Sequence, residues 1–271
     1  MPINDEIGKR MKSYYEQIPN TRLMRRCPVC IRIDGKAFHT FTRGFNRPFD
    51  EALINTMQET MRYLCENIQG CVLGYHQSDE ISLILIDYKN LNSAAWFDYE
   101  VQKMCSISAS MATMAFNKMF EEKCVVNSLV LPNTDESKKI KDAYAKAISN
   151  CALFDARCFN LPKEEVTNYI YWRQLDATRN SIQMVGQSNF SHKELQGKSC
   201  SQIQDMLLEN KGINWNDFFT YQKRGSCCIK KEYLTDDGAI RTHWMIDRGI
   251  PIFKGENREY IDKLIYVGEE K

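Results

Sequence analysis

The sequence predicts an α+β fold of the ferredoxin-like, split βαβ type, with a helical C-terminal extension. Three observations predict it. The elements before about residue 160 follow the order strand, helix, strand, strand, helix, strand. The two middle strands are separated by a short polar segment, which is typical of a hairpin. From Pro162 onward, apolar residues recur mainly at helical spacing. We therefore divide the 271-residue chain into a first domain, residues 1–160, and a mainly helical extension, residues 161–271, that packs on it.

Each element of the first domain has its own signal. The first strand is a short apolar run that ends at Asp34-Gly35, a turn signal. The first helix is amphipathic, and Gly70 is placed to terminate it. The second helix is rich in small residues that permit close packing on a sheet. The predicted strands are 28–33, 71–76, 81–86 and 152–159, and the predicted helices are 50–68 and 98–120.

The extension begins with a helix at Pro162 that runs to about residue 185. Ser191 and Glu194 have the spacing of a capping box, which predicts a second, short helix. We expect the polar C-terminal tail to be partly loose. A third helix is predicted over 201–210, and two late strands, 225–234 and 239–246, flank the turn Asp236-Asp237-Gly238.

Composition is ordinary for a globular protein, with 43% apolar and 26% charged residues. No apolar run approaches the roughly 20 residues that cross a bilayer. The N-terminus lacks the apolar centre of a signal peptide, so we expect a cytoplasmic protein without a membrane partner. The net charge is only +1, so a nucleic acid would have to be held by local patches. One such patch is the basic N-terminal segment of Lys9, Arg10, Lys12, Arg22, Arg25 and Arg26.

The eleven cysteines predict reduced, mostly buried thiols, because the number is odd and the chain is not a short disulfide scaffold. Cys27 and Cys30 match half of a zinc site. A second such pair or a close pair of histidines is missing from the sequence, so we favour a structural role for both.

The strongest local signal for chemistry is acidic. In the predicted topology the first and third strands are neighbours, which brings Asp34 next to Asp79 and Glu80. Carboxylate and carbonyl oxygens suit Mg²⁺, and two such ions about 4 Å apart can activate a hydroxyl and stabilise a leaving pyrophosphate. The competing interpretation is that these are ordinary polar turn residues, since Asp and Gly are common in turns.

Several separated segments resemble, in order, the tRNA-His guanylyltransferase family. The resemblance extends over most of residues 28–230. The matching segments are Arg32-Ile33-Asp34-Gly35-Lys36-Ala37-Phe38-His39-Thr40-Phe41, Tyr75-His76-Gln77-Ser78-Asp79-Glu80-Ile81-Ser82, Phe154-Asp155-Ala156-Arg157, Tyr171-Trp172-Arg173-Gln174-Leu175-Asp176 and Glu194-Leu195-Gln196-Gly197.

The resemblance implies a polymerase palm that works in the 3′-to-5′ direction. In this scheme ATP adenylylates the 5′-phosphate of tRNA, and the 3′-hydroxyl of an incoming GTP displaces AMP. Pyrophosphate is then removed from the added nucleotide. It also implies that two Mg²⁺ ions bind Asp34, Asp79 and the Gly35 carbonyl, with Glu80 supporting the catalytic site. The nucleotide would be held by Asp34, Gly35, Lys36, Ala37, Phe38, His39, Ser78 and Asp79.

Further contacts follow from the same resemblance. Arg47 falls where the family has a basic residue near the activation site, and Arg173, Arg179 and Asn180 share one helix that could meet tRNA. A surface arginine and a salt-bridged helix face are the alternatives. A partly buried loop histidine is the alternative for His39. The family also implies a homotetramer.

One segment departs from the eukaryotic family pattern. Residues 178–184 replace a His-Ile-Asn-Asn-Leu-Tyr-Asn stretch, and only Asn180 is clearly retained. This is similar to the bacterial and archaeal guanylyltransferase-like branch, which implies template-dependent repair of 5′-truncated tRNA. Addition of a single G to tRNA-His is the alternative. Two further classes stay open: a palm-fold nucleotidyl cyclase, and a non-catalytic RNA-binding module, although the first and third strands lack the aromatic residues that such a module uses.

Overall fold

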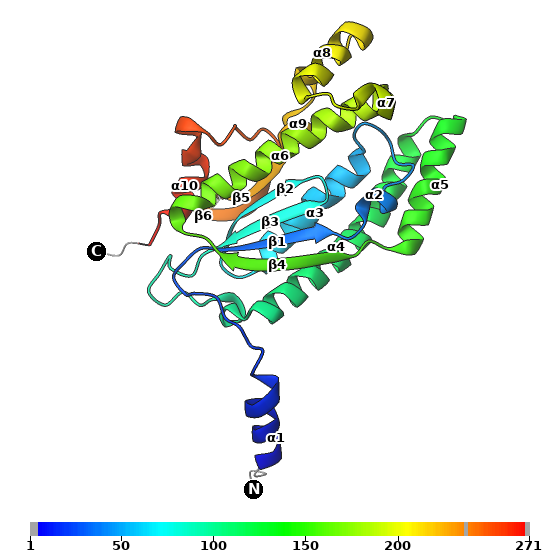
Figure 1. The fold of residues 1–271 in the computed structure, drawn as a ribbon. Helices are drawn as coiled ribbons and strands as arrows, with labels where there is room; N and C mark the ends of the chain where they lie inside the picture. The colour runs from blue at the N-terminus through cyan, green and yellow to red at the C-terminus, as the bar shows by residue number, and fades with distance from the viewer. Residues whose placement is uncertain (1–4, 236–237, 269–271) are drawn as a thin grey trace.

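A single antiparallel sheet organises the computed structural model, which describes residues 5–235 and 238–268. Six strands lie in the order β4-β1-β3-β2-β5-β6, and every neighbouring pair is antiparallel (Figure 1). The first four reproduce the predicted split βαβ order, with β1 and β3 at the centre. The strands are β1 Val29–Gly35, β2 Cys71–Gln77, β3 Glu80–Leu85, β4 Phe154–Asn160, β5 Ser226–Leu234 and β6 Ile240–Asp247.

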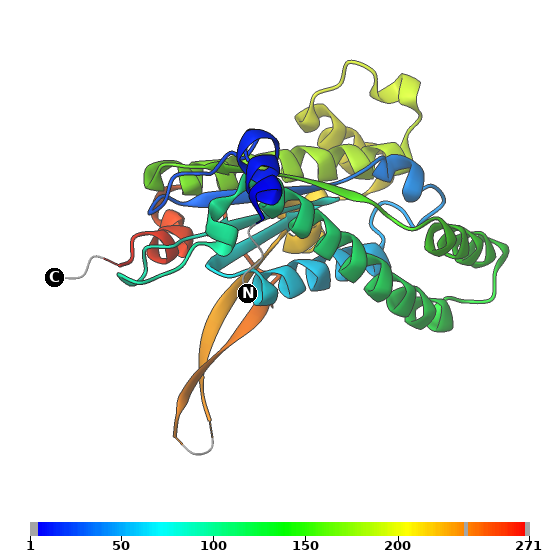
Figure 2. The same cartoon turned by 90° about the horizontal axis from the view of Figure 1, so that it is seen from below.

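Helices cover both faces of the sheet, with α3 and α4 on one side and α6 on the other (Figure 2). The strands therefore alternate between two apolar cores. Val29, Ile31 and Ile33 of β1 are buried against the α3 and α4 side, whereas Cys30 joins the core beneath α6. Helices begin at recognisable caps: the Asp50 side chain accepts from Leu53 N at the start of α3, and the predicted capping box of Ser191 is present.

The helical elements run along the whole chain. They are α1 Glu6–Met11, η1 Lys12–Glu16, α2 Phe38–Phe41, α3 Glu51–Asn67, η2 Trp96–Tyr99, α4 Val101–Val130, α5 Asp135–Asn150, α6 Lys163–Asn189, α7 His192–Leu195, α8 Cys200–Lys211, η3 Trp215–Asp217, α9 Thr220–Arg224, η4 Gly255–Arg258 and α10 Glu259–Ile265. None of the helices in the described ranges is long and apolar enough to cross a membrane.

Two predictions about helices were wrong. The second helix continues to Val130, ten residues beyond its predicted end, and α5 follows it unpredicted. The C-terminal tail is not loose over its described part, because α10 buries Ile261 and Ile265 in the core beneath α6, next to Phe253. Ile261 and Ile265 have helical spacing, but the polar residues 254–259 separate them from the apolar run that ends at Phe253.

The late hairpin lies in the predicted place, but it also extends the main sheet, since β5 pairs with β2. Its outer part projects away from the body of the molecule (Figure 2). Residues 236–237 of the predicted turn lie outside the described residues. The division into domains at residue 160 stays a prediction, and strands from both sides of that point share this one sheet.

The cysteines are all free thiols, and six of the eleven are buried. Cys30 is fully buried within the core beneath α6, and burial raises the pKa of its thiol to about 12. A thiol in such a position stays protonated and packs as a small apolar group.

An aromatic cluster supports the segment that follows β1. Phe116 of α4 is fully buried, and its ring centroid lies 5.6 Å from that of Phe38 and 5.3 Å from that of Phe154. Phe41 and Phe45 pack on the same cluster, and Phe45 is buried in the core. The cluster therefore anchors α2, which begins four residues after Asp34, to α4.

We expect Phe116→Ala to lower the free energy of unfolding by about 3–5 kcal/mol, because it opens a cavity at the centre of this cluster. Urea denaturation measures the change. The matched control is Met114→Ala on the same helix, whose residue is 55% exposed and whose substitution should change stability by no more than about 0.5 kcal/mol. Equal effects of the two substitutions would contradict the role of the cluster.

Candidate active site

Two carboxylates meet at the end of the central strands. Asp34 lies directly opposite Glu80 in the β1–β3 register, and Asp79 belongs to the tight turn between β2 and β3. The Gly35 N–H donates to the Asp79 carbonyl oxygen at 3.1 Å, which ties the turn to β1. The topology therefore brings together residues that are 45 positions apart, as predicted.

Asp79 is electrostatically unsatisfied. Burial raises the pKa of its carboxyl group, and the neighbouring Asp34 raises it further. Neither Asp34 nor Asp79 forms a salt bridge within residues 5–235 and 238–268. Two adjacent, half-buried carboxylates without a counter-ion fit a divalent cation, and Mg²⁺ commonly takes one or two carboxylates and completes its shell with water and phosphate oxygens.

Glu80 has a different environment from the two aspartates. Its carboxylate accepts from Arg173 Nε at 2.7 Å and from Arg173 Nη2 at 2.8 Å, and Arg32 Nη2 lies 2.7 Å from its second oxygen. Burial raises the pKa of Glu80, and both guanidinium groups oppose that rise. No group of three or more His, Cys, Asp or Glu side chains in the described part of the chain is placed to hold a metal. A supporting role for Glu80 fits this arrangement better than that of a metal ligand.

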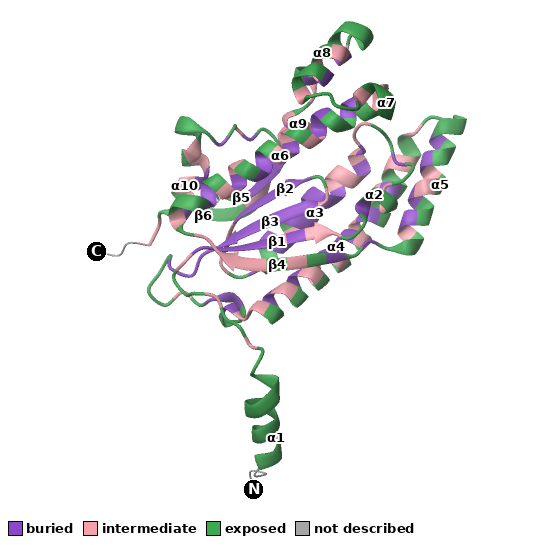
Figure 3. Cartoon of the chain, viewed as in Figure 1, coloured by how far each residue is buried: buried purple, intermediate pink, exposed green. Residues whose placement is uncertain are grey.

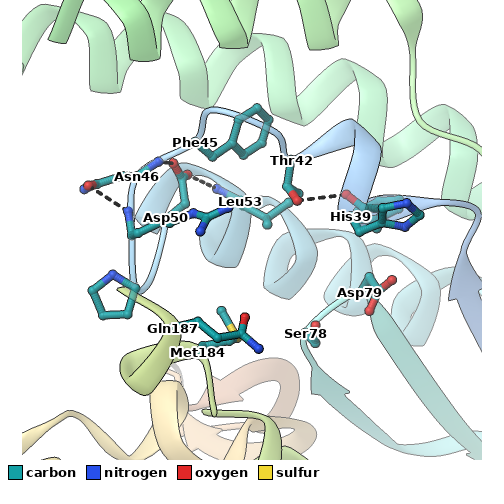
Figure 4. Close-up of a pocket in the computed structure, with 13 residues that line it drawn as sticks. His39, Thr42, Phe45, Asn46, Asp50, Leu53, Ser78, Asp79, Met184 and Gln187 are labelled. Carbon is teal, nitrogen blue, oxygen red and sulfur yellow. Dashed lines mark hydrogen bonds between the residues drawn. The ribbon is translucent and has the colours of Figure 1, made fainter. Parts of the chain in front are cut away.

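A cavity of about 390 Å³ opens beside Asp79. Its walls come from α2 and the following loop, from α3, from the β2–β3 turn and from the end of α6 (Figure 4). His39, Arg47 and Ser78 line it, together with the aromatic side chains Phe38 and Phe45. A smaller cavity of about 80 Å³ shares part of the same wall and includes Asn180. The larger volume lies within the range of nucleotide-sized sites.

The predicted nucleotide-binding segment presents its residues unequally. Lys36 and His39 are exposed, and Ala37 has a left-handed φ of 54°, which turns the chain into α2. Phe38 is buried and belongs mainly to the aromatic cluster, although it also lines the cavity. A Cβ on Gly35 would lie 2.2 Å from the Phe38 ring, so packing requires glycine at this position.

The residues predicted to face tRNA on α6 separate into two groups. Arg173 is only 5% exposed and bonds Glu80 and Asp176, so its predicted contact with tRNA finds no open surface, and the salt-bridged alternative describes it. Arg179 is exposed, although it also pairs with Asp176. Arg47 is exposed at the cavity.

Sequence reasoning missed three polar residues near the acidic pair. Arg32 of β1 neutralises Glu80. Asp155 of β4 lies opposite Asp34 on the other side of β1 and pairs with Arg157 at 3.1 Å. The alternation of these charged residues with apolar ones along β1 and β4 was the available signal.

The fold and the site together define the class of this protein. An antiparallel sheet covered by helices, with two adjacent carboxylates at the end of its central strands and a cavity of nucleotide size beside them, is the arrangement of a nucleotidyltransferase.

Comparisons with known proteins identify the family. The family model for tRNA(His) guanylyltransferase matches residues 8–162, more than half of the chain, so the chain belongs to this family. It is similar to a solved bacterial tRNA(His) guanylyltransferase-like protein in complex with ATP, with 42% identity, a TM-score of 0.81 and coverage of 96% of this chain and 99% of that one. A structure of such a protein in complex with GTP gives 40% identity, a TM-score of 0.76 and coverage of 97% and 100%.

Among curated relatives, the tRNA(His) guanylyltransferase of Candida glabrata is 26% identical over 90% of this chain and 99% of its own length. The family suggested by the sequence motifs is thus confirmed. The similarity to bacterial guanylyltransferase-like proteins agrees with the predicted branch.

We expect Asp79→Asn to lower nucleotide transfer by at least roughly 100-fold, because a metal ligand supplies several kcal/mol of transition-state stabilisation. The metal-free variant should melt at the same temperature as the wild type or higher at neutral pH. The reason is that the raised pKa of Asp79 makes its charged form unfavourable in the folded state.

The raised pKa of Asp79 also determines how the stability difference between the variant and the wild type depends on pH. A carboxyl group with a raised folded-state pKa contributes stability at low pH and loses it as the pH rises through that pKa. The difference in melting temperature between Asp79→Asn and the wild type should therefore shrink on acidification. Calorimetry over a pH series measures it, and an unfolded Asp79→Asn protein would favour the alternative of an ordinary turn residue.

Arg173→Met should lower the free energy of unfolding by about 3–5 kcal/mol, because it leaves the buried Glu80 carboxylate with one guanidinium fewer. Arg179→Ala is the matched control on the same helix: its side chain is 61% exposed, and the change should stay within about 0.5 kcal/mol. Denaturant titration compares the two variants, and a small effect of Arg173→Met would contradict the proposed clamp on Glu80.

Proposed function

We propose that this protein is a palm-type polymerase that adds nucleotides in the 3′-to-5′ direction to the 5′ end of truncated tRNA, copying the opposite side of the acceptor stem. The observation that carries the proposal is the near full-length similarity to bacterial guanylyltransferase-like proteins in complex with ATP and GTP. The open cavity beside Asp79, whose carboxylate has Asp34 as a neighbour, supports it.

The proposed reaction has two transfers. In the first, an oxygen of the tRNA 5′-monophosphate attacks the α-phosphorus of ATP, and pyrophosphate leaves. In the second, the 3′-hydroxyl of the incoming nucleoside triphosphate attacks the tRNA phosphorus, and AMP leaves. The added nucleotide carries the new 5′ triphosphate, from which pyrophosphate is finally removed.

Asp34, Asp79 and the Gly35 carbonyl are the groups that would hold Mg²⁺. When bound, Mg²⁺ would supply charge stabilisation for the attacking and leaving oxygens. The chain's own residues position the substrates. His39 and Arg47 are exposed at the cavity, where a cationic or hydrogen-bonding side chain can orient phosphate groups or a base. Asn180 of α6 lines the smaller cavity, and the exposed Arg179 precedes it on the same helix; both would meet the tRNA or the nucleotide.

Addition of a single G to tRNA-His is the second candidate, because curated relatives are named for that activity. Residues 178–184 argue for repair, since they depart from the eukaryotic motif. The other two classes have less support. An RNA-binding module needs an open sheet face, but α6 and α10 cover one face and α3 and α4 cover the other. A cyclase would be an exception within the matched family.

Self-association into a homotetramer is part of the proposal. The N-terminal helix α1 extends away from the sheet and is exposed along its length (Figure 3). Ile7 of α1, Tyr14 of η1 and Ile18 just after η1 are more than 60% exposed, as are Leu129 and Val130 at the end of α4. Apolar groups of this kind commonly mark contacts between proteins. A monomer in light scattering at the assay concentration would contradict the tetramer.

The test of function is labelled-nucleotide incorporation with ATP and Mg²⁺. The substrates are a 5′-truncated, monophosphorylated tRNA and full-length tRNA-His, with Asp79→Asn as the inactive control. We expect templated extension of the truncated tRNA, at a higher kcat/KM than for tRNA-His, because the segment that differs lies on the wall of the site. Exclusive addition of one G to tRNA-His would instead establish the second candidate.

Arg179→Ala refines this test. It should raise the KM for tRNA by several-fold and leave the KM for GTP unchanged, because the guanidinium group is exposed and a single phosphate contact contributes about 1 kcal/mol or less at the surface. Unchanged kinetics with tRNA would show that Arg179 belongs only to its ion pair with Asp176.

A further inference from the structure

A chain of hydrogen bonds crosses the interior from β6 to the turn that carries Asp79. Arg248, just after β6, donates from Nε to Gln58 Oε1 of α3 at 2.8 Å. Gln58 Nε2 donates to Ser226 Oγ of β5 at 3.2 Å. Ser226 Oγ lies 3.5 Å from His76 Nδ1, and His76 Nε2 lies 3.0 Å from the Ser78 carbonyl oxygen. Gln58, Ser226 and Arg248, which are distant from the turn in sequence, are thus linked to it through His76.

The groups at the two ends of this series of hydrogen bonds determine which atom donates and which accepts in each bond. The Arg248 guanidinium can only donate, and the Ser78 carbonyl can only accept. Gln58 therefore offers its oxygen to Arg248 and its amide nitrogen to Ser226. The Ser226 hydroxyl hydrogen is then directed to His76 Nδ1, and His76 carries its proton on Nε2. One tautomer of His76 satisfies all four groups.

The three middle residues of this series, Gln58, Ser226 and His76, are buried and have no other function in the proposed reaction. Gln58 and Ser226 are fully buried, and His76 is 3% exposed. Burial lowers the pKa of His76 to about 4, so the ring is neutral near neutral pH. Its Nδ1 lone pair and its Nε2 proton are both engaged, so the imidazole has no free group with which to act as an acid or base on a substrate.

The turn that accepts the hydrogen bond from His76 contains a residue with a rare backbone conformation. Ser78 has a left-handed φ of 52°, a region that non-glycine residues rarely adopt. The Ser78 carbonyl accepts from His76, and the next carbonyl, that of Asp79, accepts from the Gly35 N–H at 3.1 Å. Both carbonyls of the two-residue turn are thereby restrained, which limits the directions that the Asp79 carboxylate can take.

We propose that His76 is a positioning residue, which holds the β2–β3 turn through the Ser78 carbonyl so that Asp79 stays aligned with Asp34. The C-terminal part of the chain takes part in this alignment through Ser226 and Arg248. The inference rests on the proposed role of Asp79 in holding Mg²⁺ and the nucleotide.

Two polar substitutions of His76 test the proposal, because their amide nitrogens lie at different distances from the backbone. The amide nitrogen of glutamine occupies about the position of histidine Nε2, so His76→Gln can still donate to the Ser78 carbonyl. The amide nitrogen of asparagine occupies about the position of Nδ1, so His76→Asn cannot. His192→Leu, at an exposed histidine on α7, is the control for loss of a histidine elsewhere.

The first measurement needs neither metal nor tRNA: hydrogen exchange of the Gly35 amide, which reports the bond to the Asp79 carbonyl. We expect faster exchange in His76→Asn and wild-type exchange in His76→Gln and His192→Leu. The second is calorimetric binding of GTP with Mg²⁺. We expect roughly tenfold weaker binding for His76→Asn, because the partly buried Ser78 carbonyl loses its donor, and a kcat for tRNA extension that falls with it.

The results for His76→Asn decide whether His76 positions the turn. Wild-type Gly35 exchange and GTP affinity in His76→Asn would overturn the proposal, as would a lower melting temperature with unchanged binding, which indicates a purely structural histidine. If His76→Asn does not fold, Ser226→Ala takes its place, with a severalfold loss of affinity expected and no change contradicting the proposal. If the wild type binds GTP but extends no tRNA, the proposed function fails, while the role of His76 is still judged by binding and exchange.

Discussion

The antiparallel pairing of β1 with β3 is the constraint on which the site depends. It sets Asp34 opposite Glu80 and leaves Asp79 in the adjoining turn, so three acidic side chains gather in a small, partly buried volume. Burial, and after it the charge of Asp34, raises the pKa of Asp79. Arg32 and Arg173 neutralise Glu80, and the charge that stays uncompensated is that of the two aspartates beside the cavity. The pairing therefore concentrates negative charge at one place, where a cation can be held.

The rest of the molecule restrains this arrangement from several sides. Helix α6 contacts Glu80 through Arg173, and β5 contacts His76 of β2 through Ser226. The aromatic cluster around Phe116 anchors the segment that follows Gly35. By contrast, His39, Arg47 and Arg179 are exposed. The acidic residues are thus held in place by packed elements, while the residues proposed to contact the substrates are exposed. This suits a site that needs fixed catalytic groups and binds large substrates.

Much of the fold follows from local patterns in the sequence. The strands and helices of the split βαβ unit were predictable because apolar residues recur with the period of each element, as in residues 50–68. Helix α5 carried the same kind of signal, with Ile140, Tyr144 and Ala147 buried on one face and Thr134 as its cap, and it could have been predicted. The buried tail carried a weaker signal, because its apolar residues fall in two short groups, around Phe253 and Ile261, on either side of the polar stretch 254–259.

The sequence by itself determined the order of the elements, the family motifs and the meeting of Asp34 with Asp79, because local periodicity and one known topology are sufficient for these. Only the tertiary structure decided that Glu80 is clamped by Arg173, that Arg173 is buried rather than open to tRNA, and that β5 joins the sheet beside β2. These facts depend on side chains that meet across 93 and about 150 positions of the chain, and no local period records such a contact.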